Sequence, residues 1–129
     1  MKQSPIYETE PVNMPGAGRF LNAAVSAETS LAPRDCLAAL KAIERQLGRP
    51  SRHPRNSPRT LDLDLLLYDS AIIRQPGFVV PHPGFHERAF VLKPLADIAP
   101  GLVHPVLRRR ISTLLRAVNQ DGVRRWNGN

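Results

Sequence analysis

Hydrophobic positions along the chain recur with two different periods, and each change of period marks a predicted element. A helical period predicts a helix over 33–47, where Pro33 suits the first turn and Gly48 follows the end. The buried stripe expected for this helix is Leu37, Leu40, Ile43 and Leu47. The other expected elements, in chain order, are strands over 5–12 and 20–29 around a Pro/Gly loop at 13–18, a strand over 60–68, a hairpin of 72–73 and 78–80 around Pro76-Gly77, and helices over 86–96 and 110–118.

The strand predicted over 60–68 carries the least expected polar residues of the chain. Its leucines at alternate positions would share one face, and Asp62 and Asp64 would lie side by side on the other. Two ionised carboxylates held this close raise each other's pKa unless a cation lies between them. Oxygen-only ligands favour Mg²⁺ or Mn²⁺. The alternative is an edge strand whose solvated face simply carries two acids.

A basic segment rich in proline lies just before this strand. Its arginines recur at every third or fourth position, as Arg49, Arg52, Arg55 and Arg59. Pro50, Pro54 and Pro58 exclude a regular helix, so a loop is predicted. Guanidinium groups beside metal-binding acids are suited to a metal-bound polyphosphate. A solvated basic linker is the alternative.

A second cluster of polar residues precedes the helix predicted over 86–96. His82, His86 and Arg88 are candidate phosphate donors. The spacing of the two histidines also occurs among zinc ligands on helices. Zinc is disfavoured here because His82 lies between two prolines, off the helix, and because there is no HExxH order and no cysteine nearby.

Two runs of the sequence carry a family resemblance. The runs PRTLDLDLLLYD and VPHPGFHERAFVLKPLADIAP resemble 6-hydroxymethyl-7,8-dihydropterin pyrophosphokinase, an enzyme family of folate biosynthesis. Upstream residues agree in order, and the resemblance runs from about Ser4 to Pro105. It implies an α+β fold, a ferredoxin-like αβ sandwich with an antiparallel sheet. It also implies one pyrophosphokinase-like domain over 1–129, in which 106–129 form a basic C-terminal helix and tail.

Family members begin with a hydrophobic strand that ends in a Gly-Ser-Asn turn and is followed by a helix. Neither feature occurs in this sequence, so the fold is expected to be N-terminally truncated relative to the family. A fragment, a wrongly assigned start and a genuine short form all remain open. Such a chain is expected to have an open sheet edge, to be a monomer or a dimer through that edge, and to be less active than a complete one.

The resemblance implies Mg²⁺-dependent transfer of the terminal pyrophosphoryl group of ATP to the hydroxymethyl oxygen of the pterin, with release of AMP. It assigns two Mg²⁺ ions to Asp62 and Asp64, and Asp64 is also expected to contact ATP. Arg49, Arg59, His82 and Arg88 match the phosphate-facing, catalytic positions. The pterin-binding positions are Phe20 and Phe90, which would stack on the pterin, Asn22, which would read its polar edge, and the backbone near Thr9 and Val12.

Each assignment has a simpler alternative. Phe20 and Phe90 are also compatible with the core, Asn22 with a turn cap, and His82 with a bond to a backbone carbonyl. Glu44 matches a recurrent family position but is equally compatible with a helix surface. The sequence departs from many relatives at Asn56-Ser57, where those relatives place an aromatic or basic residue, and this puts some ATP contacts in doubt.

Composition restricts the remaining function classes. The chain has 129 residues, a net charge of +7 and one cysteine, Cys36, so an internal disulfide is excluded and a reducing cytoplasm is expected. No membrane span and no signal peptide are expected. The positive charge suits anionic small molecules, here ATP and a reduced pterin. A nucleic-acid module is disfavoured because few aromatics interleave with the arginines, and a metal-dependent nuclease leaves the pterin-pocket residues unexplained. A non-catalytic homologue that binds nucleotide or serves as a partner subunit stays open.

Overall fold

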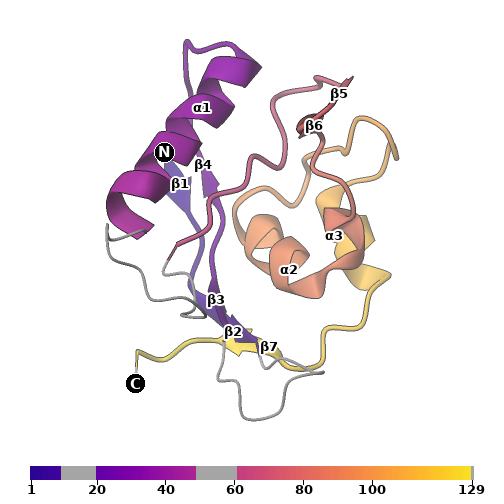
Figure 1. Ribbon diagram of the computed structural model, residues 1–129. Helices are drawn as coiled ribbons and strands as arrows, with labels where there is room; N and C mark the ends of the chain where they lie inside the picture. The colour runs from indigo at the N-terminus through magenta and orange to yellow at the C-terminus, as the bar shows by residue number, and fades with distance from the viewer. Residues whose placement is uncertain (10–19, 49–60, 129) are drawn as a thin grey trace. The chain divides into compact units, whose positions relative to one another are not determined.

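The computed structural model describes residues 1–9, 20–48 and 61–128 (Figure 1). These residues form two compact units, which are described separately. The first unit comprises Met1–Glu28 and Pro83–Asn129, and the second comprises Thr29–His82.

The first unit combines short antiparallel strands with two helices. A three-stranded sheet has the order β3-β2-β7, formed by β2 (Tyr7–Thr9), β3 (Phe20–Asn22) and β7 (Val123–Arg125). A separate pair joins β1 (Lys2–Gln3) to β4 (Val25–Ser26), and all of these pairings are antiparallel. Helix α2 (Ala89–Ile98) packs against α3 (Ile111–Arg116) and against β2. The centre of this unit includes Tyr7, Phe85, Leu92, Leu95 and Ile111, all buried.

The second unit contains one long helix and a hairpin. Helix α1 (Pro33–Ile43) continues into a π-helical turn (Glu44–Gly48). The hairpin pairs β5 (Ile73–Gln75) with β6 (Phe78–Val80). Gly77 adopts a φ of 71° in the two-residue turn, a conformation that glycine enters at little cost.

Most of the elements expected from periodicity are present. The helix predicted to begin at Pro33, the hairpin around Pro76-Gly77 and the α+β class with antiparallel strands are confirmed. The helix expected over 86–96 begins later, at Ala89, because a 3-10 turn (Phe85–Glu87) and an extended Arg88 precede it. The strand expected over 20–29 is divided into β3 and β4, and Ser4 bonds to the backbone of Ala24 beside the break.

Three further expectations need correction or addition. The strand predicted over 60–68 is wrong, because 61–68 join no β-ladder in the described structure. The predicted helix stripe is only half correct: Leu37 and Leu40 are half-buried, but Leu47 is 73% exposed and Ile43 is also exposed. Glu44 turns inward, in phase with Leu37 and Leu40, and the wider π turn that begins at Glu44 takes Leu47 out of that phase. Strand β7 was not expected, since three residues rich in arginine show no alternation.

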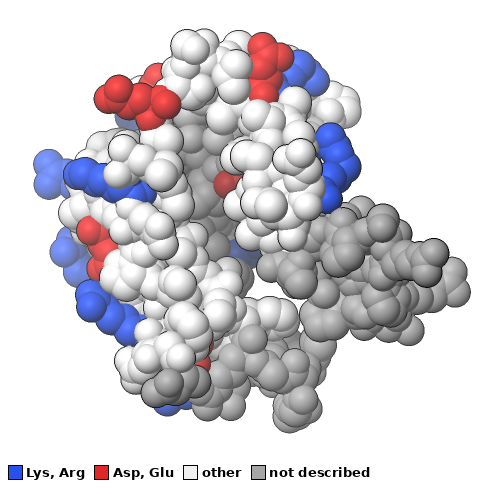
Figure 2. All heavy atoms as spheres, turned by 90° about the vertical axis from the view of Figure 1, so that its left-hand side faces the viewer, with Lys and Arg blue, Asp and Glu red and all other residues white. Residues whose placement is uncertain are grey.

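Two observations concern the surface and the helices. Figure 2 shows that both acidic and basic side chains of the described residues reach the surface. Among the described helices, none is long and apolar enough to cross a bilayer.

Candidate functional site

The acid-bearing segment 61–68 lies in the second unit and keeps its alternation without a strand partner. Asp62 and Asp64 are exposed, while Leu61 and Leu63 are half-buried. The predicted two-sided character of the segment is therefore correct even though the predicted strand is not. Two neighbouring carboxylates with access to solvent supply the hard oxygen donors that Mg²⁺ prefers.

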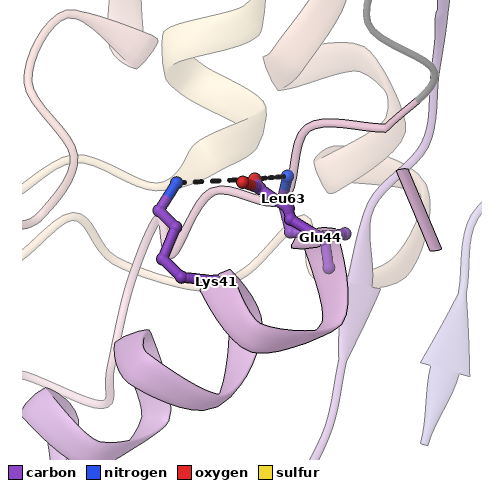
Figure 3. Close-up of polar contacts among 3 residues, drawn as sticks. All are labelled: Lys41, Glu44 and Leu63. Carbon is purple, nitrogen blue, oxygen red and sulfur yellow. Dashed lines mark hydrogen bonds and ion pairs between the residues drawn. The ribbon is translucent and has the colours of Figure 1, made fainter. Parts of the chain in front are cut away.

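Backbone hydrogen bonds tie this segment to other parts of its unit. The backbone N–H of Leu63 donates to Oε2 of Glu44 at 2.5 Å, and the backbone C=O of Leu66 accepts the N–H of His82 at 2.9 Å. The first of these bonds comes from the π turn at the end of α1 (Figure 3). These backbone groups are thus partly satisfied by a side chain and by a remote loop residue rather than by a neighbouring strand, which accounts for the missing ladder.

His82 ends the second unit, directly after the cis peptide bond between Val80 and Pro81. Its backbone bond to Leu66 holds it next to the acid-bearing segment in this unit. Its Nδ1 is buried and has no hydrogen-bond partner among the described residues. Buried polar atoms are normally paired, so this nitrogen is a candidate contact for a bound ligand.

No group of three or more His, Cys, Asp or Glu side chains suited to a metal is present in the part of the chain that the structure describes. Among the described residues, the acid-bearing segment therefore supplies two carboxylate donors. This pattern is typical of Mg²⁺ sites, in which one or two carboxylates act with water and substrate phosphates.

The first unit brings together three of the residues expected to bind the pterin, Thr9, Phe20 and Asn22. Thr9 is the direct cross-strand partner of Phe20, and Tyr7 is the partner of Asn22. Partners in an antiparallel pair, and residues two apart on one strand, share a face, so all four side chains lie on the same side of the sheet. The hydroxyl of Tyr7 donates to the carboxylate of Asp97 on α2, so this is the side on which α2 packs.

Side-chain exposure on this face separates Phe20 from the core residues. Phe20 is 53% exposed, so its alternative interpretation as an ordinary core residue is wrong. Phe90, on α2, is half-buried, as is Asn22. The hydroxyl of Thr9 is buried and finds no partner among the described residues, although the sequence had indicated only its backbone as a contact. An exposed aromatic ring beside an unpaired hydroxyl is suited to a flat polar heterocycle.

Arg88 lies in the first unit, just before α2, with an exposed side chain. His86, on the preceding 3-10 turn, has Nε2 3.3 Å from Oε1 of Glu87 and its ring 6.2 Å from that of His104. His86 therefore takes part in local contacts of the first unit. Three other expected residues, Arg49, Arg59 and Val12, lie outside the described residues.

Two titratable groups of the first unit have shifted pKa values. Burial, followed by the hydrogen bond to Asp97, raises the pKa of Tyr7, although nearby Arg125 opposes this change. Burial, and then the neighbouring His86, lowers the pKa of His104. Nδ1 of His104 accepts the backbone N–H groups of Val106 and Leu107, which also requires that nitrogen to be unprotonated. Through these hydrogen bonds, Tyr7 joins β2 to α2, and His104 holds the turn that follows it in the first unit.

Comparison with known proteins identifies the family. The model of the 7,8-dihydro-6-hydroxymethylpterin-pyrophosphokinase (HPPK) family matches residues 1–100. The chain belongs to the HPPK family. The 2-amino-4-hydroxy-6-hydroxymethyldihydropteridine pyrophosphokinase of Pseudomonas aeruginosa is 44% identical over 125 residues, which are 97% of this chain and 76% of that protein. The protein of the same name from Bacillus subtilis is 43% identical over 97% of this chain and 70% of its own length.

A longer relative shows the same segment inside a larger protein. Folic acid synthesis protein fol1 of Schizosaccharomyces pombe is 36% identical over 96% of this chain, and the matched segment spans 17% of that protein. The HPPK segment therefore also occurs as a part of larger chains.

One residue beside the acid-bearing segment was not among the predicted site residues. Glu44 is only 8% exposed, so its interpretation as a surface helix residue is wrong. The sequence does hold a signal: Glu44 follows Leu37 by seven positions and Leu40 by four, and so it continues the apolar stripe of the helix. A carboxylate in phase with a buried stripe usually has a specific partner, which here includes the backbone of Leu63.

Proposed function

We propose that this chain catalyses the Mg²⁺-dependent transfer of the pyrophosphoryl group of ATP to 6-hydroxymethyl-7,8-dihydropterin, with release of AMP. Membership of the HPPK family supports this reaction. The observation that carries the proposal is the exposed pair Asp62 and Asp64 on a segment whose leucines turn inward. In the reaction, the hydroxymethyl oxygen of the pterin bonds to the β-phosphorus of ATP. The bond from that phosphorus to the α–β bridging oxygen breaks, AMP carries away the electron pair, and the hydroxyl proton is released.

Asp62 and Asp64 would hold Mg²⁺, and two ions are expected. Their solvent access and all-oxygen chemistry fit this ion. When bound, Mg²⁺ supplies charge neutralisation along the β- and γ-phosphoryl oxygens. The protein's own part is positioning and charge stabilisation: Arg49, Arg59, His82 and Arg88 would take the remaining phosphate charge.

The pterin would bind on the α2-facing side of the β2–β3 pair. Phe20 and Phe90 would stack on its faces, and Asn22 would read its polar edge. Thr9 and Val12 would contribute backbone groups, and the buried hydroxyl of Thr9 supports a polar contact there as well. Binding the acceptor in a fixed orientation accounts for much of the rate expected from such a site.

The proposed partners are small molecules, ATP and the reduced pterin, in a cytoplasmic setting that suits the single cysteine of the sequence. One fold domain is proposed for the whole chain, with the basic segment 106–129 as its C-terminal part. A monomer is the expected state, and a dimer would use the open edge of β3, which ends the three-stranded sheet within the described residues.

Direct measurement of AMP tests the proposed reaction. The purified chain is incubated with ATP, Mg²⁺ and 6-hydroxymethyl-7,8-dihydropterin, and products are separated by anion-exchange chromatography. AMP and the pterin diphosphate should form in equal amounts, and only when both the pterin and Mg²⁺ are present. ADP with inorganic phosphate, or no product at all at high enzyme concentration, would contradict the proposal and favour a non-catalytic homologue.

A further inference from the structure

A nearly buried carboxylate lies directly behind the acid pair, in the same unit. Oε2 of Glu44 accepts the backbone N–H of Leu63 at 2.5 Å and lies 3.4 Å from Nζ of Lys41 (Figure 3). The side chain of Glu44 is 10% exposed, whereas that of Lys41 is 43% exposed. The bond to Leu63 joins the end of α1 to the acid-bearing segment, whereas the contact with Lys41 stays within the helical run.

Local preferences do not explain a carboxylate at this place. Burying a charge is unfavourable unless it is well paired. Glu44 is nearly buried where α1 continues into the π-helical turn, so this cost applies to it. The ion pair with Lys41 and the tertiary bond to Leu63 offset the cost, since hydrogen bonds to ionised acceptors are about twice as strong as neutral ones.

The position of Leu63 decides what this bond controls. Leu63 lies between Asp62 and Asp64, and its N–H is on the peptide group that links it to Asp62. Fixing that peptide plane restricts ψ of Asp62 and φ of Leu63, and with them the direction of the Asp62 side chain and the path of the chain into Asp64. No strand pairs with this segment among the described residues, so the carboxylate takes the place that a neighbouring strand would otherwise occupy.

We propose that Glu44 is a positioning residue for the acid pair: it holds the Leu63 peptide so that Asp62 and Asp64 present their carboxylates together to a divalent cation. The identity of that cation and of its phosphate ligand rests on the function proposed above. Glu44 acts on the aspartates through the backbone of Leu63. The side chain must therefore be long enough to bring an acceptor oxygen to the Leu63 N–H, and this length matters more than the charge of Glu44.

Two conservative substitutions separate the length of the side chain from its charge. Glu44→Gln keeps an acceptor oxygen at the same distance but removes the charge. Glu44→Asp keeps the charge but is one methylene shorter and no longer reaches Leu63. Glu44→Ala removes both properties. Asp35→Ala is the matched control, because Asp35 is an exposed acid at the other end of the same helix.

The readout is divalent-metal binding to the full-length chain, measured by electron paramagnetic resonance titration of Mn²⁺ with a non-hydrolysable ATP analogue. When a residue that orients a metal ligand through a hydrogen bond is removed, the metal affinity typically falls by about 10–100-fold. We expect Glu44→Ala and Glu44→Asp to raise the Mn²⁺ dissociation constant about tenfold, and Glu44→Gln to raise it less than about threefold. Asp35→Ala should leave it unchanged. Pterin binding, measured by calorimetry, should stay unchanged in every variant.

Several results would overturn this role. A folded Glu44→Ala protein with normal Mn²⁺ affinity would do so. Equal losses of Mn²⁺ and pterin binding would also do so, because they would indicate that Glu44 stabilises the whole fold. Weaker Mn²⁺ binding by Glu44→Gln than by Glu44→Asp would show that charge is the decisive property. If Glu44→Ala does not fold, the order of the Gln and Asp variants still decides, together with amide hydrogen exchange at Leu63, which should be slow in Glu44→Gln and fast in Glu44→Asp.

The same experiment distinguishes this inference from the proposed function. The double variant Asp62→Asn/Asp64→Asn defines the Mn²⁺ site, and AMP formation by the unaltered chain tests the reaction. If no AMP forms but Mn²⁺ binding depends on both aspartates and on Glu44, the reaction is wrong and the positioning role stands. If AMP forms but Glu44 has no effect on Mn²⁺ binding, the reaction stands and the positioning role is wrong.

Discussion

The two units of this protein support their candidate site residues in different ways. In the first unit, Thr9 and Phe20 are paired across a β-ladder, and neighbouring backbone bonds hold both of them. In the second unit, Asp62 and Asp64 lie on a segment without a ladder, and its described bonds include one to the Glu44 side chain and one to the backbone of His82. A ladder positions its residues through regular backbone pairing, whereas the described bonds of the acid-bearing segment include a side-chain acceptor, Glu44. Single substitutions behind the site should therefore matter more in the second unit.

The largest expected effect tests whether the proposed reaction depends on metal binding by the acid pair. Asp62→Asn/Asp64→Asn should reduce Mg²⁺-dependent AMP formation by at least about 10²–10³-fold, because the variant loses the charge that holds the cation against the phosphates. Both aspartates are exposed, so the thermal midpoint and pterin binding should change little. Asp69→Asn is the control, an exposed acid just beyond the segment at a φ of 49°, a conformation that Asn also tolerates. Normal turnover by the double variant would show that the metal site is elsewhere.

The next effect tests the pterin face of the first unit. Phe20→Ala and Phe90→Ala should each weaken pterin binding by about 1–3 kcal/mol, the value of a base stacked on an aromatic ring, with little change for an ATP analogue. Calorimetric titration with each ligand measures this. Leu21→Ala is the matched control, because Leu21 is equally exposed but lies on the opposite face of the same strand. Equal losses for the two ligands would instead indicate a packing role for the rings.

A smaller effect is expected on stability, when the hydrogen bond of one tyrosine hydroxyl is removed from each unit. Tyr7→Phe removes the bond to Asp97 from a buried residue and should lower the free energy of unfolding by about 1–1.5 kcal/mol. Tyr68→Phe removes the bond to the Leu31 carbonyl at an exposed site in the second unit and should cost less than about 0.5 kcal/mol. Urea denaturation followed by circular dichroism measures both. The reverse order would mean that the second unit contributes more to stability than its burial suggests.

The smallest expected effect is the pH dependence of stability. Burial lowers the pKa of His104, so the unfolded chain binds a proton at a higher pH than the folded chain. The contribution to stability is complete above the unfolded value of about 6.5 and is lost as the pH falls through and below it. His104→Asn keeps an acceptor for the N–H groups of Val106 and Leu107 but does not titrate. Urea midpoints between pH 5 and 8 should then show a shallower slope in this variant, and an unchanged slope would mean that other groups cause the dependence.

Much of the site could be predicted from sequence because its signals are local. The alternation of leucine and aspartate requires only the period-2 geometry of an extended chain, and the exposure of 61–64 confirms it. The hairpin follows in the same way from Pro76-Gly77, since proline presets one dihedral and glycine permits the left-handed one. These preferences act over a few residues, so tertiary contacts need not be known.

The features that the sequence did not predict depend on partners far away in the chain. Whether 61–68 becomes a strand depends on what accepts its N–H groups, and a carboxylate nineteen residues away accepts that of Leu63. β7 exists because β2 pairs with it, although its own three residues show no periodicity.

The sequence by itself therefore determined the family, the two faces of the acid-bearing segment and most of the helices, because side-chain periodicity reports local backbone geometry. Only the tertiary structure decided that Glu44 bonds to the backbone between the two aspartates, and that Phe20 remains exposed beside the Thr9 hydroxyl, which has no partner among the described residues. The physical reason is that backbone hydrogen bonds and burial are satisfied between distant segments, and periodicity does not encode which segments meet.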